Sequence, residues 1–285
     1  MARPEYLLAY FGHHKCASTW IHSILASVCD EIGLRSSYLA NEEMFGNDLP
    51  GYLAQNNIDV LSLVNANIEH VRKLPDFRGF HMIRDPRDIL TSAYFSHMHS
   101  HKTEAWPTLI THRAELQRVS KDEGLFLEMD FNADVFEDMK TWDYEQPNVM
   151  ELKQEDFTKD PLNGFVEVFR FLGALNETHH GKKAQAKYLF TSSANVIRRH
   201  YKLPIGKPMA TLPAERLLGI VHNHRFETKT AGRAAGNEDV KSHYRKGTAG
   251  DWRNHFNAEH VSEFKKRHNK LLIQLGYETN PDWKL

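Results

Sequence analysis

The stretch YLLAYFGHHKCASTW at residues 6–20 decides the fold class. Residues 6–11 are a short apolar run of the kind that forms a buried strand. After a polar turn, residues 19–25 carry apolar side chains at helical spacing. We therefore predict a strand, a loop and a helix in direct succession. In that arrangement backbone N–H groups and the positive end of the helix dipole converge on the loop and favour an anion.

Side chains of the loop add to this tendency. Lys15 contributes a mobile positive charge, Ser18 and Thr19 contribute hydroxyl donors, and Trp20 could lay its ring against a base. The loop is not the P-loop of nucleotide kinases, because the glycine spacing and the Gly-Lys-Ser/Thr ending are missing. An ordinary helix capped by Ser18 or Thr19 explains the loop equally well, so other segments must decide.

Strand and helix patterns alternate along the rest of the chain. Further strands are predicted at residues 58–64, 79–83 and 149–152. Helices are predicted at residues 87–97, 108–119, 162–172, 182–199 and 258–275. No repeat or Pro/Gly-rich linker divides the chain. We therefore expect an α/β fold, a single domain over residues 1–285 with a central parallel sheet flanked by helices.

Two segments fall outside this alternation. Residues 100–146 are expected to form an insertion or a lid. Residues 228–239 are rich in glycine and small side chains, which predicts a loop that orders on a ligand.

The composition limits the class of protein. With 36 Lys+Arg against 37 Asp+Glu, the net charge of -1 gives no global field for nucleic acid or an anionic membrane. Cys16 and Cys29 are too few for a disulfide framework, which favours a reducing compartment. Residues 6–11 do not end in a cleavage site, and no stretch reaches the ~20 apolar residues of a membrane span. We expect a cytoplasmic protein that binds neither nucleic acid nor membrane; its oligomeric state is left open.

A second candidate phosphate site lies at residues 84–92. Arg84 follows an apolar run, so it would lie at the carboxyl end of a strand, where α/β folds bind ligands. Ser92 comes about two helical turns later, so both side chains can face one pocket. Alternatively, Arg84 pairs with Asp85 or Asp88 at the start of the helix, which leaves Ser92 without a role.

A third candidate is RKGTAGDWRNHF at residues 245–256. Arg245 and Lys246 place two charges side by side, and Gly247 allows the backbone to approach a ligand closely, as in a compact phosphate clamp. A solvated basic turn before the last helix is the simpler explanation when this segment is taken alone.

Together the three segments resemble the motifs of the sulfotransferases that use 3′-phosphoadenosine-5′-phosphosulfate (PAPS). The first resembles the phosphosulfate loop PKSGTTW, the second the 3′-phosphate motif of an arginine followed eight residues later by a serine, and the third RKGxxGDWKNxF. A weaker similarity to the family segment V-R-Y-E-D-L lies at residues 152–157. The residues that match or replace the motif positions are Lys15, Cys16, Ala17, Ser18, Thr19, Trp20, Arg84, Ser92, Arg245, Lys246 and Gly247.

The resemblance implies a P-loop NTPase-like sulfotransferase fold and transfer of a sulfuryl group from PAPS to a hydroxyl or amine of a small acceptor. It implies that the matched residues and Phe226 bind the nucleotide, and that no metal takes part. Cys16 and Ala17 depart from the Ser/Thr and Gly of the family loop, and Gln154 replaces the tyrosine near adenine. Base stacking would then rest on Trp20 and Phe226.

The usual catalytic histidine is missing. Residues 64–67 are Val-Asn-Ala-Asn, where cytosolic relatives have K-T-H-L. An alcohol acceptor still needs a base, and Lys15 is expected to neutralise charge on the departing oxygen. The candidates for the base are Glu42, Glu43, His70, His14 and His22. We favour Glu43 and His70, although each candidate could equally be a side chain without a catalytic role.

Three alternatives remain at this point. The histidines at positions 97, 99 and 101 suggest a metal, but their alternate spacing spreads the rings around a helix axis. A small-molecule P-loop kinase would leave the second and third segments unexplained. A non-catalytic nucleotide-binding protein is compatible with the lost histidine, but the intact Lys15 argues against it.

Overall fold

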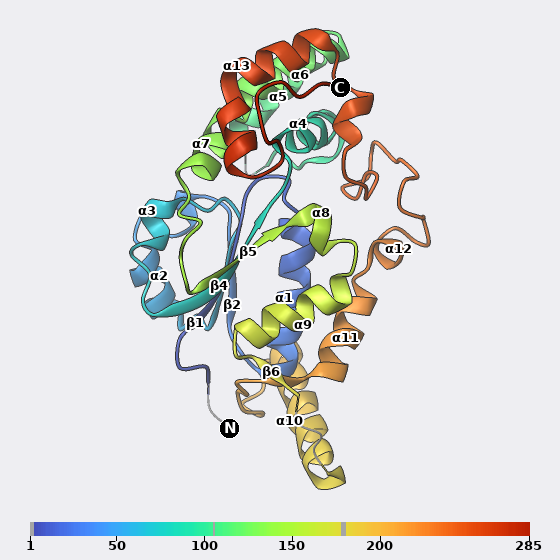
Figure 1. Ribbon diagram of the computed structural model, residues 1–285. Coiled ribbons are helices and arrows are strands. Elements are labelled where there is room, and N and C mark those ends of the chain that lie inside the picture. The colour runs from blue at the N-terminus through green and yellow to red at the C-terminus, as the bar shows by residue number, and fades with distance from the viewer. Residues whose placement is uncertain (1–2, 105, 178–180) are drawn as a thin grey trace. The chain divides into compact units, whose positions relative to one another are not determined.

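The computed structural model describes residues 3–104, 106–177 and 181–285. The chain forms two units that alternate along the sequence, and Figure 1 labels their elements. The sheet unit comprises Met1–His13, Ala17–Met82 and Asp143–Arg225. The helical unit comprises His14–Cys16, Ile83–Trp142 and Phe226–Leu285.

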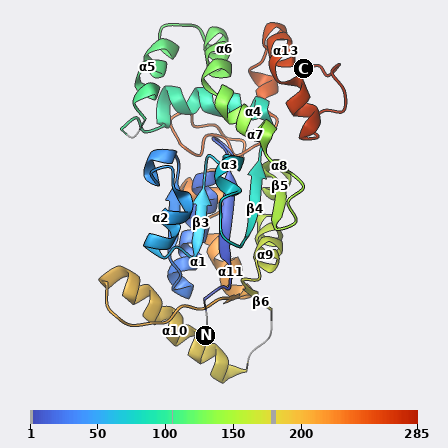
Figure 2. The same cartoon turned by 90° about the vertical axis from the view of Figure 1, so that its left-hand side faces the viewer.

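A five-stranded sheet in the order β2-β3-β1-β4-β5 lies at the centre of the sheet unit. Its strands are β1 (Leu7–Gly12), β2 (Ser36–Leu39), β3 (Val60–Leu63), β4 (Phe77–Ile83) and β5 (Val149–Lys153). β1 pairs in parallel with both β3 and β4, which flank it in Figure 2. All residues of β1 and β3 are buried. Apolar runs are expected of parallel strands covered on both faces, and the predicted central parallel sheet is confirmed.

Helices surround this sheet. They are α1 (Ser18–Ile32), α2 (Leu49–Asn56), α3 (Ile68–Val71), α8 (Gln154–Phe157), α9 (Pro161–Phe171), α10 (Lys182–Tyr201) and α11 (Ala214–Asn223). A 3₁₀ turn, η1 (Glu42–Met44), and two short paired strands, β6 (Leu175–Asn176) and β7 (Leu212–Pro213), complete the unit. α1 packs against α10 and α11 and buries Ile21, Ile24 and Val28.

The helical unit contains α4 (Pro86–Phe95), α5 (Pro107–Leu116), α6 (Lys121–Phe131), α7 (Ala133–Thr141), α12 (Phe226–Lys229) and α13 (Ala258–Gln274). It also contains a π-helical turn, η2 (Ser96–Ser100), and a 3₁₀ turn, η3 (Asp251–Asn254). Most of the segment expected to be a lid or insertion forms α5, α6 and α7 instead (Figure 2). Leu109, Leu125 and Phe136 are buried on these helices, so the segment belongs to a packed core.

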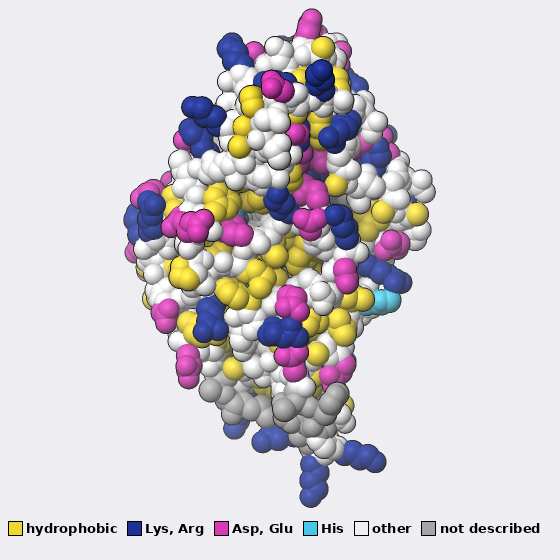
Figure 3. Space-filling view, in the orientation of Figure 1, with side chains coloured by type: hydrophobic (Ala, Val, Ile, Leu, Met, Phe, Trp, Pro, Cys, Tyr) yellow, Lys and Arg dark blue, Asp and Glu magenta, His cyan; other side chains and the backbone are white. Residues whose placement is uncertain are grey.

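The charged side chains agree with the balanced composition. On the face shown in Figure 3, Lys and Arg are interspersed with Asp and Glu. In the described parts of the chain, none of the helices combines the length and the apolar composition needed to cross a membrane.

Candidate functional site

Two residues of the loop after β1 have left-handed backbones. Lys15 has φ 64° and Ala17 has φ 61°, although neither is glycine. This conformation costs a residue with a Cβ about 1–2 kcal/mol. Ala17 occupies the motif position where the family has glycine, and it caps α1 without a side-chain hydrogen bond. The loop is therefore held in a strained shape that sets the position of Lys15.

The part of the loop that enters α1 belongs to the sheet unit. Ser18 Oγ lies 3.0 Å from the hydroxyl of Tyr10. The Trp20 indole donates to the carbonyl of His224 at 2.8 Å, and its ring packs edge-on against Phe157 and Phe165. Thr19 is exposed. Ser18 and Trp20 thus help to fix the start of α1.

Lys15 and Arg84 meet in the helical unit. Arg84 Nη1 donates to the Lys15 carbonyl at 3.1 Å. Burial and the charge of Arg84 lower the pKa of Lys15 to about 7; Glu128 opposes this shift, and Arg245 adds to it. The structure thus brings together one basic residue from each of the three motifs. Because the cations destabilise one another, the cluster is suited to an anion of high charge.

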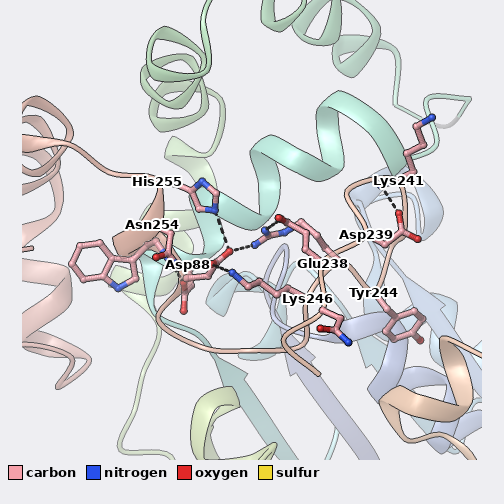
Figure 4. A network of polar contacts seen from close by, with 12 residues as sticks. Asp88, Glu238, Asp239, Lys241, Tyr244, Lys246, Asn254 and His255 are labelled. Atoms are coloured by element: carbon pink, nitrogen blue, oxygen red, sulfur yellow. Dashed lines mark hydrogen bonds and ion pairs between the residues drawn. The ribbon is translucent and has the colours of Figure 1, made fainter. Parts of the chain in front are cut away.

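Asp251 organises the next two cations, in a polar network of which Figure 4 labels Lys246, Asn254 and Glu238. Its carboxylate accepts from Arg245 at 2.5 Å and from Lys246, and also from Asn254 at 2.9 Å. Burial alone would raise the pKa of Asp251, but these hydrogen bonds hold it well below its ordinary value. Arg245 also pairs with Glu238. The adjacent charges are therefore preoriented, since the carboxylate remains ionised at neutral pH.

The loop that bears these cations is tied to the start of α4. Asp88 accepts hydrogen bonds from the backbone N–H groups of Gly250 at 2.6 Å and Trp252 at 3.0 Å. Arg87 is buried against Asp85 and stacks over the Trp252 ring, 4.1 Å from its centroid. The acidic residues beside Arg84 therefore anchor the third motif to the second, rather than pairing with Arg84 as the simpler interpretation supposed.

Phe226 and Gly247 are in contact. Gly247 has φ 71°, and a Cβ built there would lie 2.8 Å from the Phe226 ring. Glycine is thus required for two reasons, backbone conformation and space. Phe226 is half-buried and also stacks beneath the Arg233 guanidinium. Ser92 lies half-buried on α4.

A group of histidines surrounds Glu128 in the helical unit. His97 Nδ1 lies 2.9 Å from Glu128 Oε1, and His112 Nε2 is at the same distance from that oxygen. His14 Nε2 lies 3.0 Å from His97 Nε2. The imidazole of His101 packs beside both His14 and His97. His97 lies on η2 and His101 directly follows it, and Arg113 donates to the carbonyl groups of both.

The two residues predicted to act as base do not pair with each other. Glu43 is exposed on η1. His70 binds the neighbouring Glu42, with 2.6 Å between Nε2 and Oε1, and its Nδ1 is buried without a hydrogen-bond partner among the described residues. Neither ring nitrogen of His70 is therefore open to an acceptor in this arrangement.

The predicted site residues divide between the two units. The sheet unit holds Ala17, Ser18, Thr19, Trp20, Glu43 and His70. The helical unit holds Lys15, Cys16, Arg84, Ser92, Phe226, Arg245, Lys246 and Gly247. Sequence reasoning missed the anchoring roles of Asp88 and Asp251, and it missed Glu128 and His112 altogether. For Asp251 the signal was its place inside the third motif, whereas Glu128 gave none.

Comparison with known proteins identifies the class of protein. A model of the sulfotransferase domain family matches residues 12–276. The chain therefore belongs to this family, and it is a sulfotransferase. No curated protein matches the sequence.

Among solved structures, the mouse sulfotransferase SULT7A1, complexed with PAP, is 16% identical with a TM-score of 0.53. That alignment covers 95% of this chain and 86% of the other. Retinol dehydratase, in a complex with retinol and PAP, is 15% identical, with a TM-score of 0.49 and coverage of 100% and 84%. The first similarity supports the sulfotransferase fold.

Proposed function

We propose that the protein transfers a sulfuryl group from PAPS to a hydroxyl or amine of a small acceptor and releases 3′-phosphoadenosine 5′-phosphate (PAP). The observation that carries this proposal is the clustering of Lys15, Arg84 and Arg245. Three motifs far apart in the sequence contribute one cation each. PAPS carries anionic groups on both sides of its ribose, so it offers negative charge to Lys15 and Arg84 in addition to the charge that Asp251 and Glu238 give to Arg245.

Each part of the cluster has a distinct task in this proposal. Arg84, Ser92, Arg245 and Lys246 bind the 3′-phosphate and so distinguish PAPS from ATP. Lys15 lies on the loop before α1 and neutralises charge on the oxygen that leaves sulfur. By analogy with phosphoryl transfer, catalysis rests mainly on position and charge. Phe226, which lies beside Gly247, is the candidate contact to adenine.

The site of action is proposed to be the cytoplasm. Cys16 and Cys29 are both buried and neither forms a disulfide, and burial raises the pKa of Cys29 to about 12. This supports a reducing compartment. The acceptor is proposed to be a small molecule, and no metal is assigned a role in the transfer.

Calorimetric titration tests the choice of nucleotide. PAP should bind more tightly than ADP or ATP. Arg84→Ala should weaken PAP by about 30-fold, which corresponds to about 2 kcal/mol, because one charge-assisted contact is lost. ADP affinity should change little, which makes ADP the internal control. Tighter binding of ATP than of PAP would favour the kinase interpretation, and unchanged PAP affinity in Arg84→Ala would remove that residue from the site.

A further inference from the structure

Glu128, His97 and His14 form a hydrogen-bonded relay, and His14, at its end, directly precedes Lys15 in the sequence. Glu128 is 0% exposed, and it accepts from His97, from His112 and from Asn132 at 2.7 Å. Burial opposes ionisation, but the hydrogen bonds from His112 and His97 lower the pKa of Glu128. The carboxylate is thus an ionised acceptor that fixes the orientation of both imidazoles.

The relay determines where the protons lie on His14. His97 must donate from Nδ1 to the Glu128 carboxylate, and burial lowers the pKa of His97, so the ring is neutral with a lone pair on Nε2. His14 Nε2, 3.0 Å away, must therefore carry the hydrogen and donate it. The lone pair of neutral His14 is then on Nδ1. In the described part of the chain no residue hydrogen bonds to that atom.

Two other histidines, His13 and His22, are held by hydrogen bonds but belong to the sheet unit, whereas His14 and Lys15 belong to the helical unit. His13 forms a similar chain through His81 to Glu151, with 2.9 Å and 2.6 Å between the atoms, but it is only 1% exposed. The Nδ1 of His22 lies 3.0 Å from Ser62 Oγ. His14 is half-buried, and its Nδ1 is oriented by the hydrogen bond from Nε2 to His97.

A divalent metal is the competing occupant. Ligand atoms of His14, His97 and His101 lie within 4.8 Å of one another. However, burial lowers the pKa values of all three rings most, and the charge of Lys15 lowers them further. The same charge repels a divalent cation more strongly than a single proton. The surroundings therefore favour neutral imidazoles that accept a proton only when negative charge arrives.

We propose that His14 is the general base of the transfer and that His97 and Glu128 are its positioning residues. This rests on the proposed function. The acceptor O–H gives its proton to His14 Nδ1 while the acceptor oxygen forms a bond to sulfur. The bond from sulfur to the 5′-phosphate oxygen breaks, and its electron pair leaves with PAP. The His14 imidazolium keeps its Nε2–H bond to His97 and later releases the proton to water.

The arrangement also accounts for the missing family histidine. Residues 64–67 carry no base, whereas His14 directly precedes Lys15. The base and the lysine that acts on the leaving oxygen would thus come from one loop. The negative charge of bound PAPS would also raise the proton affinity of His14 for the transfer step.

Nitrogen-15 NMR of the wild-type protein with and without PAP tests the relay without an acceptor. We expect His14 as the neutral Nε2–H form and His97 as the neutral Nδ1–H form. A hydrogen on His14 Nδ1, or zinc bound at one ion per chain in metal analysis, would overturn the proposal. PAP binding is measured on the same sample, so failure of the proposed function is seen separately.

Kinetics with His14→Gln test the role in the reaction. Transfer from labelled PAPS to benzyl alcohol should fall about 100-fold or more, while PAP affinity stays unchanged. Transfer to 4-nitrophenol, which ionises by itself at mildly alkaline pH, should fall much less. His99→Gln, an exposed histidine on η2, is the matched control and should act as the wild type. If the His14→Gln transfer rate falls equally with both acceptors, or with neither, the role of His14 as base is refuted. If the wild type transfers to neither acceptor, the tautomer measurement decides.

Glu128→Gln tests positioning through the pH profile. The charged or titratable groups that act on His14 are Lys15, His97, His101 and His243. Removal of the Glu128 anion makes protonation of the His14 imidazole less favourable. The acid limb of the pH profile of kcat should therefore move to lower pH, while KM is unchanged. A fall in kcat with an unmoved limb would indicate a structural role only. If this variant does not fold, His97→Gln takes its place and the readout is the His14 tautomer measured by nitrogen-15 NMR, which should change; an unchanged tautomer would refute the positioning role.

Discussion

Proton uptake by Lys15 on nucleotide binding is the most informative consequence of the cation cluster. In the free protein, burial and Arg84 lower the pKa of Lys15 to about 7. Phosphate groups of PAP would add negative charge beside the ammonium group and raise this pKa toward its ordinary value near 10.5. Binding should therefore take up a proton.

The amount follows from the fraction of Lys15 that is protonated before binding. With a pKa of about 7, roughly half of the lysine is protonated at pH 7, so uptake is about 0.5 proton. At pH 8 uptake rises to about 0.9 proton, and at pH 6 it falls to about 0.1. PAP affinity should correspondingly weaken as the pH rises from 6 to 9, roughly tenfold per unit above pH 7.

Calorimetry measures this uptake directly. The binding enthalpy is determined in buffers of different ionisation enthalpy, and its slope gives the number of protons. Lys15→Ala should lose the uptake between pH 7 and 8, whereas Lys270→Ala, an exposed lysine on α13, should retain it. Equal uptake in wild type and Lys15→Ala would show that Lys15 does not titrate on binding and would refute the argument.

Three further predictions concern the loops. Ala17→Gly should relieve the left-handed strain at φ 61° and raise the free energy of unfolding by about 0.5–1 kcal/mol in urea denaturation; a loss of stability would contradict the strain argument. Gly247→Ala should weaken PAP at least about tenfold with an unchanged circular dichroism spectrum, because its Cβ would meet the Phe226 ring; unchanged affinity would place that contact outside the site. Asp251→Asn should reduce stability at pH 7 by about 3 kcal/mol. The folded pKa of Asp251 is lowered, so the stability that its carboxylate contributes is present above the ordinary pKa of 3.8 and is lost as the pH falls below that value. In acid unfolding curves the wild type and Asp251→Asn should therefore become more alike.

The sequence was most informative where a short pattern has only one structural solution. Residues 6–11 and 79–83 contain too little polar surface for anything but covered strands, and β1 and β4 lie there. Ser36–Leu39 was missed because only two of the four residues of β2 are apolar. The start of α6 could have been found, since Ser120 and Glu123 form a capping box. The predicted single domain stays a prediction.

The site was predictable as far as motifs extend along the chain. Lys15, Arg84 and Arg245 each stand in a recognisable segment, and the structure places them close enough to perturb one another. The relay was beyond reach, because Glu128 follows His97 by 31 positions and their contact depends on how α6 packs on α4. The metal argument treated residues 97, 99 and 101 as one set. In the structure His97 and His101 share a face with His14, while His99 is exposed.

Transfer of labelled sulfate from PAPS to a panel of small hydroxylated and aminated molecules tests the central claim most directly. The account predicts a labelled product for at least one acceptor, formation of PAP in equal amount, and a large fall in kcat in Lys15→Ala, together with the weaker nucleotide binding that follows from loss of the Lys15 charge. Full transfer by Lys15→Ala, or a wild-type protein that shows no preference for PAP over ADP, would contradict it.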